Sequence, residues 1–74
     1  MDRKKVDKEI AARCKGKLTE KRVKMNAVAM KLGVSDNTIY QKMLGNNSLS
    51  CSELATIASS YNFTREDVRF ILFG

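Results

Sequence analysis

Apolar residues recur along this chain at helical spacing and are separated by short polar turns. Near the amino terminus they fall on every fourth position, at Val6, Ile10, Cys14 and Leu18. This spacing places one apolar stripe along a single helix, which we predict to begin at Asp2 or Arg3 and to end near Lys21. Gly16 lies off the stripe, so we expect the helix to continue through it; the alternative is an end near Lys15 followed by a loop.

The later helices share a starting signal, in which one apolar residue precedes a capping residue and a second follows five positions after the first. This hydrophobic staple occurs at Val34 and Ile39, at Leu49 and Leu54, and at Phe63 and Val68. The capping residues are Ser35, Ser50 and Thr64, the last two followed three residues later by an acid. With a stop at Gly45-Asn46-Asn47, these signals predict helices over residues 24–32, 36–44, 51–60 and 65–72.

The chain is therefore predicted to fold as an all-α protein, a compact bundle of about five short helices forming one domain over residues 1–74. Each short helix is marginal alone, so packing must hold the bundle together. The expected shared core consists of Ile10, Val28, Leu32, Ile39, Met43, Leu54, Ile57, Ala58 and Val68.

The carboxy-terminal run 68–73 has more apolar residues than one helix face can bury. If Val68, Ile71 and Leu72 pack inward, Phe70 and Phe73 remain exposed. An exposed aromatic pair on so small a domain predicts a dimer or partner contact. The alternative is a frayed tail that folds back onto the core.

The net charge of +6 is unevenly distributed along the chain. Residues 1–31 hold 11 Lys/Arg and 4 Asp/Glu, which gives +7, whereas residues 32–74 hold 3 and 4, which gives −1. A basic amino-terminal half suits a polyanion, and nucleic acid is the commonest in cytoplasm. The alternative is a solvated helix face whose lysines serve solubility.

Several classes of protein are disfavoured by composition. There is no histidine, and two distant cysteines are expected to be buried or half-buried apolar groups, so we expect no metal site, cofactor or enzymatic activity. No apolar run approaches the roughly 18 residues that span a bilayer, and the first residues are too polar for a signal peptide. The apolar stripe of the first helix suits a core better than a membrane surface. We therefore expect a cytoplasmic protein with no membrane partner.

Residues 28–39 carry the pattern of a helix, a glycine, a tight turn and a second helix. Ala29 leaves room for two helices to cross closely, and Gly33 supplies the positive φ that ends the first. Val34 and Ile39 are the apolar residues that seat the second helix. This layout predicts a helix-turn-helix, whose second helix normally enters a DNA major groove.

From Val23 to Val68 the chain resembles the λ-repressor-like helix-turn-helix domains of phage repressors, Cro-type regulators and their bacterial relatives. The residues that carry the resemblance are Val28-Ala29, Leu32-Gly33-Val34-Ser35, Thr38-Ile39, Gly45, Leu49, Leu54 to Ala58, and Phe63-Thr64 with Glu66. The resemblance implies a motif core at 24–45. It also implies a phage Cro-like repressor of a lysis–lysogeny switch, acting in a bacterial host cell on double-stranded DNA at a near-palindromic operator, as a homodimer.

The second helix of the motif turns its amides away from the core. Ile39 and Met43 point inward, so at about 100° per residue Asn37 and Gln41 point outward. The amide fork of these residue types matches adenine N6 and N7, so we hypothesise that they contact neighbouring base pairs. The alternative is two amides on an ordinary wet helix face. The predicted base-reading set is Asp36, Asn37, Tyr40 and Gln41.

Phosphate contacts are expected around that surface, at Lys24, Ser35, Lys42, Asn46 and Asn47, with a basic arm of Arg3, Lys4 and Lys5. Two features count against simple DNA binding: Met25 replaces a glutamine usual in the family, and the Asp36 carboxylate repels phosphate. These features and an outward Met30 favour an alternative, an antirepressor or corepressor that keeps the fold but binds a partner phage repressor.

Overall fold

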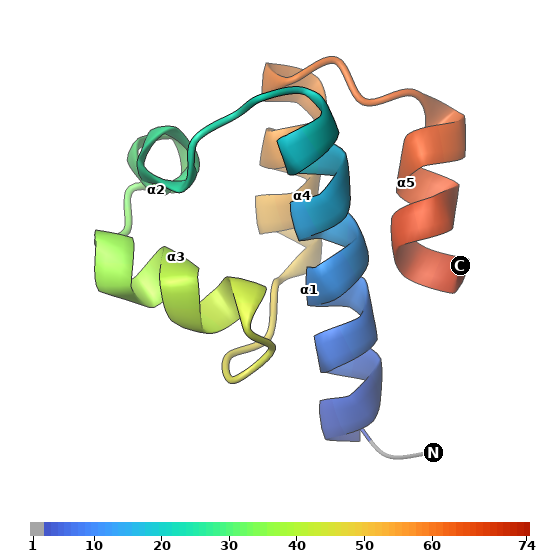
Figure 1. The fold of residues 1–74 in the computed structure, drawn as a ribbon, viewed down its shortest axis with the longest axis horizontal. Coiled ribbons are helices and arrows are strands. Elements are labelled where there is room, and N and C mark those ends of the chain that lie inside the picture. Colours follow the sequence, from blue (N-terminus) through green and yellow to red (C-terminus); the bar gives the residue numbers. More distant parts are fainter. Residues whose placement is uncertain (1–2) are drawn as a thin grey trace.

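The computed structural model describes residues 3–74, with side chains from Lys4 onward, and contains five helices and no strand in that range. They are α1 (Arg3–Glu20), α2 (Met25–Leu32), α3 (Asp36–Met43), α4 (Cys51–Ser60) and α5 (Arg65–Phe73) (Figure 1). The predicted all-α bundle is confirmed. The predicted helix start at Asp2 and the Arg3 side chain of the basic arm lie outside the described residues.

The local signals in the sequence place the helices correctly, and every predicted boundary within residues 3–74 lies within one residue of the observed one. α1 continues through Gly16, as expected. Ser35 caps α3 by accepting from the backbone N–H of Thr38, and capping boxes start at Ser50 and Thr64. Each cap satisfies backbone donors that a helix start leaves unpaired.

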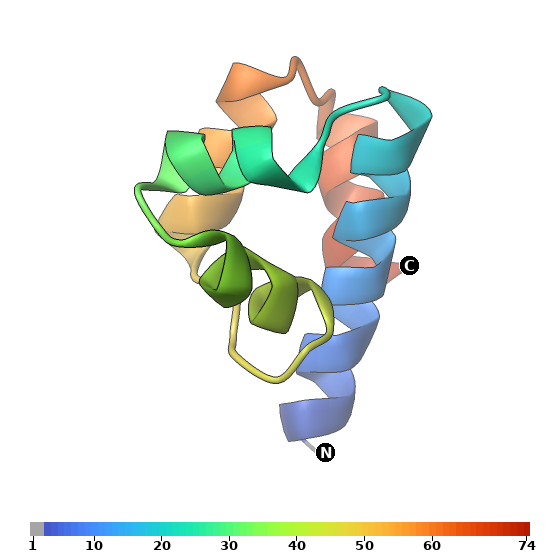
Figure 2. The same ribbon diagram turned by 60° about the vertical axis from the view of Figure 1, so that its left-hand side comes forward.

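The bundle is built around α1, the longest helix, which contacts α5 on one side and α3 on another (Figures 1 and 2). α5 runs back alongside α1, and α2 contacts both α3 and α4. None of the helices in the described residues combines the length and apolar character needed to cross a lipid bilayer.

The core draws on all five helices. Its buried apolar residues are Ala11, Cys14, Leu18, Val28, Ala29, Ile39, Met43, Leu54, Ile57 and Ile71. Two other expected members, Ile10 and Leu32, are partly buried against this cluster. The placement of Ala58 and Val68 in the core is wrong: both are only half-buried and line an open groove.

The carboxy-terminal segment is a regular helix to Phe73, so the alternative of a frayed tail is wrong. Ile71 is fully buried, and its carbonyl accepts a hydrogen bond of 2.9 Å from Arg13 Nε on α1. Phe70 and Phe73 are exposed, as predicted. Leu72 was expected to pack inward but is also exposed, because α5 turns Ile71 rather than Leu72 towards α1.

Candidate nucleic-acid interface

The connection between α2 and α3 is a tight turn over residues 33–35. Gly33 adopts φ +68°, and its N–H donates to the Met30 carbonyl at 3.2 Å. The next N–H, of Val34, donates to the Ala29 carbonyl at 3.0 Å. The predicted left-handed glycine is confirmed, and the turn makes α3 cross α2 steeply: Figure 1 views α2 along its axis while α3 lies across the page.

The rotation of α3 about its own axis is fixed by its buried side and its cap. Ile39 and Met43 are 1% and 5% exposed. Ser35 Oγ accepts from Thr38 N at 3.1 Å and lies 2.9 Å from Thr38 Oγ1. Ser35, predicted to contact phosphate, therefore uses its side-chain hydroxyl to cap the amino-terminal end of α3.

Three of the four predicted base-reading residues on the outward face of α3 are exposed. Asp36, Asn37 and Tyr40 are exposed, and Leu44 is exposed just past the end of the helix. Gln41 is half-buried at the edge of this face. The predicted base-reading residues thus share one surface.

Asn46 is hydrogen-bonded to both the side chain and the backbone of Gln41. Its Nδ2 donates to Gln41 Oε1 at 2.7 Å, and its backbone N–H donates to the Gln41 carbonyl at 3.0 Å. The side chain of Asn46, predicted to contact phosphate, therefore points towards Gln41. An amide oxygen has two lone pairs, so Gln41 keeps one acceptor position and both N–H donors for another partner.

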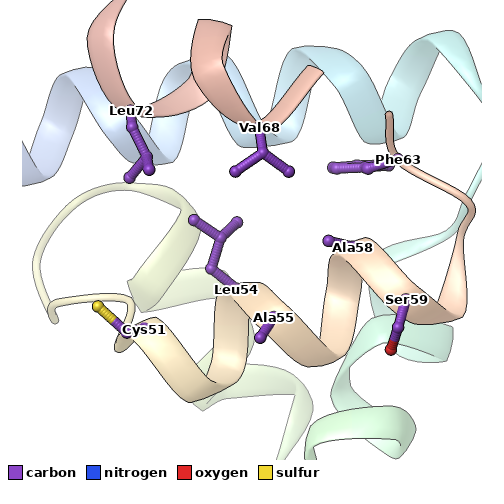
Figure 3. A pocket seen from close by; sticks show the side chains of 8 residues that line it. All are labelled: Cys51, Leu54, Ala55, Ala58, Ser59, Phe63, Val68 and Leu72. Atoms are coloured by element: carbon purple, nitrogen blue, oxygen red, sulfur yellow. The ribbon is translucent and has the colours of Figure 1, made fainter. Parts of the chain in front are cut away.

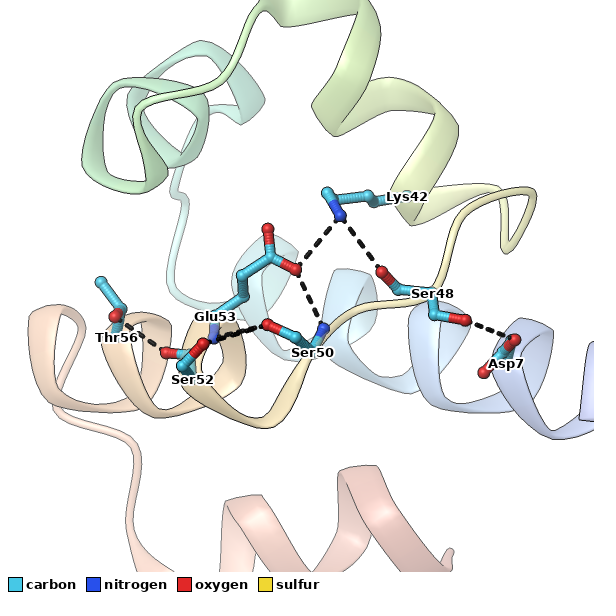
Figure 4. A network of polar contacts seen from close by, with 7 residues as sticks. All are labelled: Asp7, Lys42, Ser48, Ser50, Ser52, Glu53 and Thr56. Carbon is cyan, nitrogen blue, oxygen red and sulfur yellow. Dashed lines mark hydrogen bonds and ion pairs between the residues drawn. The ribbon is translucent and has the colours of Figure 1, made fainter.

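Lys42, predicted to contact phosphate at the rim of this surface, has its ammonium group held elsewhere, so its contacts do not support that prediction. Its ammonium donates to Glu53 Oε1 and to the Ser48 carbonyl, both at 3.1 Å (Figure 4). The side chains of Lys42 and Glu53 are only 14% and 20% exposed. The ammonium is occupied in a junction between α3, α4 and the loop that joins them.

The charge on Glu53 is stabilised within this junction. Burial alone would raise the pKa of Glu53, but the Ser50 N–H and the Lys42 ammonium both stabilise the carboxylate. The net result is a pKa below the ordinary glutamate value. Glu53 thus serves the capping box of α4 and the ion pair with α3 at once.

The loop between α3 and α4 is also fastened to α1. Ser48 Oγ donates to Asp7 Oδ2 at 2.8 Å (Figure 4). Gly45 is buried at φ +82°, and a Cβ there would lie 2.7 Å from Lys8 Cα. The loop packs against α1 so closely that only glycine fits. Asn47, predicted to contact phosphate, is exposed on this loop.

Exposed cations are found on α1 and α2 rather than on α3. Lys24 is exposed at the start of α2, which has no side-chain cap, and Lys31 is exposed on the same helix. Lys4 and Lys5 of the predicted arm are exposed at the start of α1. On α3 itself the exposed charge is that of Asp36, since Lys42 is paired.

An apolar groove of about 430 Å³ separates α4 from α5 (Figure 3). Its lining residues are Cys51, Leu54, Ala55, Ala58, Ser59, Phe63, Val68 and Leu72. Cys51 is exposed here, contrary to the expectation of a buried or half-buried thiol. Cys14 is buried as expected, and burial raises the pKa of its thiol to about 11. No pattern in the sequence predicts this groove.

Among the described residues, no cluster of three or more His, Cys, Asp or Glu side chains is arranged to hold a metal ion. Comparisons with protein-family models, curated proteins and solved structures found no match to this chain. Its function is therefore inferred from its own residues.

Proposed function

We propose that this chain is a sequence-specific DNA-binding transcription regulator that inserts α3 into the major groove. The observation that carries the proposal is the division of α3 into two sides. Ile39 and Met43 are buried, while Asn37 and Gln41 lie one turn apart towards the other side. Amide side chains in this arrangement match the donor and acceptor pair on the major-groove edge of adenine.

The resemblance of residues 23–68 to λ-repressor-like domains supports a narrower role, that of a phage Cro-like repressor. Such a protein binds a near-palindromic operator as a homodimer, with its two reading helices about 34 Å apart. We assign the subunit contact to the exposed Phe70 and Phe73 of α5, which are 43% and 79% exposed.

The subunit contact is tested by sedimentation of the full chain. Phe73→Glu should keep the chain monomeric at concentrations where the unchanged chain dimerises. Met30→Glu is the matched control, because Met30 is 84% exposed on α2 and the substitution adds the same charge. Equal dimerisation of all three proteins would contradict the assignment of Phe73.

Base reading is tested by selecting binding sites from random duplexes. The unchanged chain should enrich one motif, and Asn37→Ala or Gln41→Ala should each relax the preference at one position by about 1–3 kcal/mol. Asn62→Gly is the control: it removes an exposed amide from the turn before α5, where φ is +55° and glycine fits without strain. No enriched motif, or a motif unaltered in the two α3 variants, would refute the proposal.

A second candidate function is a modulator that binds a partner repressor protein instead of DNA. The favouring observation is that α3 exposes the carboxylate of Asp36 while its lysine is paired, beside the exposed apolar side chains of Tyr40 and Leu44. Salt dependence separates the two functions. A DNA-binding regulator loses affinity with a log–log slope of about −0.9 per phosphate contact. A protein modulator has little duplex affinity even at low salt.

A further inference from the structure

One face of α1 is basic and open to solvent next to the end of α3. We define this lysine face as Lys4, Lys5, Lys8, Ala12, Lys15, Gly16 and Thr19, all of which are exposed. At about 100° per residue, these seven residues fall within one sector of about 120° around the helix axis. The carboxy-terminal part of the lysine face, from Lys8 to Thr19, forms a hollow together with Met43 and Leu44. The lysine face is therefore continuous with the carboxy-terminal end of α3.

The described carboxylates of α1 are held by groups outside the lysine face. Glu9 pairs with Arg13 at 3.9 Å, and Glu20 pairs with Lys17 at 3.5 Å. Asp7, the third, accepts a hydrogen bond from Ser48 Oγ on the loop between α3 and α4. Lys8 has no ion-pair partner among residues 4–74, and the same is true of Lys15. Within the described residues, the charges of Lys8 and Lys15 are thus not neutralised by an ion pair.

One edge of the lysine face lacks a side chain, at Gly16 next to Lys15. Gly16 lies within a regular helix, and a Cβ added to it would meet nothing within 4 Å. A glycine inside a helix costs about 0.5–1 kcal/mol relative to alanine. No packing contact within the fold requires this glycine, whereas a partner that approaches the helix beside Lys15 comes closer because the side chain is missing.

We propose that the lysine face binds the sugar–phosphate backbone of the same duplex whose major groove α3 enters. This inference rests on the proposed function and supplies what α3 lacks, a cation free to neutralise phosphate. Lys8 and Lys15 are seven residues apart, about 10 Å along the helix axis. One strand carries a phosphate about every 3.4 Å of duplex axis, so the two flexible ammonium groups reach separate phosphates.

The test is a salt titration of duplex binding by the Lys8→Gln/Lys15→Gln variant, with the duplex selected by the unchanged chain. Two lost phosphate contacts should make the log–log slope shallower by about 1.8. If the two affinities converge at 1 M salt, that slope difference corresponds to about 60-fold weaker binding at 0.1 M. The selected motif should not change. Glutamine retains the first two methylenes of each side chain, and a melting curve verifies folding.

Two further variants test whether binding depends on the position of the charges and on access to the lysine face, or only on net charge. Arg65→Gln/Arg69→Gln removes the same charge from α5, on another side of α1, and should leave the slope unchanged. Gly16→Leu favours the α1 helix but adds a bulky side chain at the edge of the lysine face beside Lys15, so it should raise the melting temperature and weaken duplex binding.

The outcomes distinguish this proposal from the proposed function. If the unchanged chain binds the duplex and Lys8→Gln/Lys15→Gln keeps its slope, the lysine face is not a phosphate contact, although the proposed function stands. Equal losses in both double variants would mean that only net charge matters, which also overturns the proposal. If the unchanged chain has no duplex affinity at low salt, the two proposals fail together.

Discussion

Replacing Lys42 with methionine removes the ammonium group from the junction of α3 and α4 while it keeps most of the apolar stem. The substitution separates two roles for this residue. If Lys42 is structural, as its contacts with Glu53 and Ser48 indicate, the variant loses stability and keeps its salt dependence in DNA binding. If Lys42 instead contacts phosphate, the variant keeps its stability and the salt dependence of its DNA binding becomes shallower.

The size of the effect follows from the geometry. Two unit charges 3.1 Å apart attract by about 5 kcal/mol at an effective dielectric constant of about 20. Much of this is offset by desolvation, since the Lys42 and Glu53 side chains are 14% and 20% exposed. Charge-assisted hydrogen bonds contribute about 1.5–3 kcal/mol each. Because water still reaches this pair, we expect Lys42→Met to cost about 2 kcal/mol, which lowers Tm by about 8–16 °C in a domain of this size.

The assay is denaturant unfolding of a double-mutant cycle, with Glu53→Gln as the second change. Glutamine can still accept from the Ser50 N–H, so the cycle isolates the ion pair, with an expected coupling of about 1 kcal/mol. Lys31→Met, on the exposed side of α2, should stay within about 0.5 kcal/mol of the unchanged chain. A loss below about 0.5 kcal/mol for Lys42→Met, with a salt slope shallower by about 0.9, would refute the structural role.

Three further predictions concern two glycines, one aspartate and the two cysteines. Gly45→Ala should destabilise the fold by about 2–3 kcal/mol, because φ is +82° and the new Cβ meets the backbone of α1, whereas Gly16→Ala should stabilise it by about 0.5–1 kcal/mol in thermal unfolding. The pKa of Asp67 is lowered chiefly by the backbone N–H at the start of α5. The stability that the Asp67 carboxylate gives to the fold is therefore present above the ordinary aspartate pKa and is lost as pH falls through the lowered pKa. Asp67→Asn should thus flatten the acid side of a curve of unfolding free energy against pH. Iodoacetamide should modify Cys51 in the native protein but Cys14 only after unfolding, as mass spectrometry would detect.

The features that the sequence predicts correctly depend on neighbours a few residues apart. Ser50 and Glu53 form a capping box within one helical turn, so their pairing needs no knowledge of the remaining fold. The exposure of Asn37 follows in the same way from the burial of Ile39 and Met43 on one short helix. Local periodicity therefore predicts both the helices and the composition of the candidate reading face.

The errors concern contacts that depend on the path of a loop or on the rotation of a whole helix. Lys42 pairs with Glu53 because the intervening loop returns α4 to α3, and no local pattern encodes that path. α5 carries apolar side chains on more than one face, and its contact with α1 selects Ile71 for burial. Val68 and Leu72 are then left along the groove facing α4.

The most direct test of DNA docking through α3 is a map of backbone amide NMR shifts on addition of the selected duplex. The account predicts the largest shifts at residues 36–44, with a second set along α1 from Lys8 to Lys15. Shifts confined to the α4–α5 groove, at Leu54, Val68 and Leu72, with α3 unaffected, would contradict it.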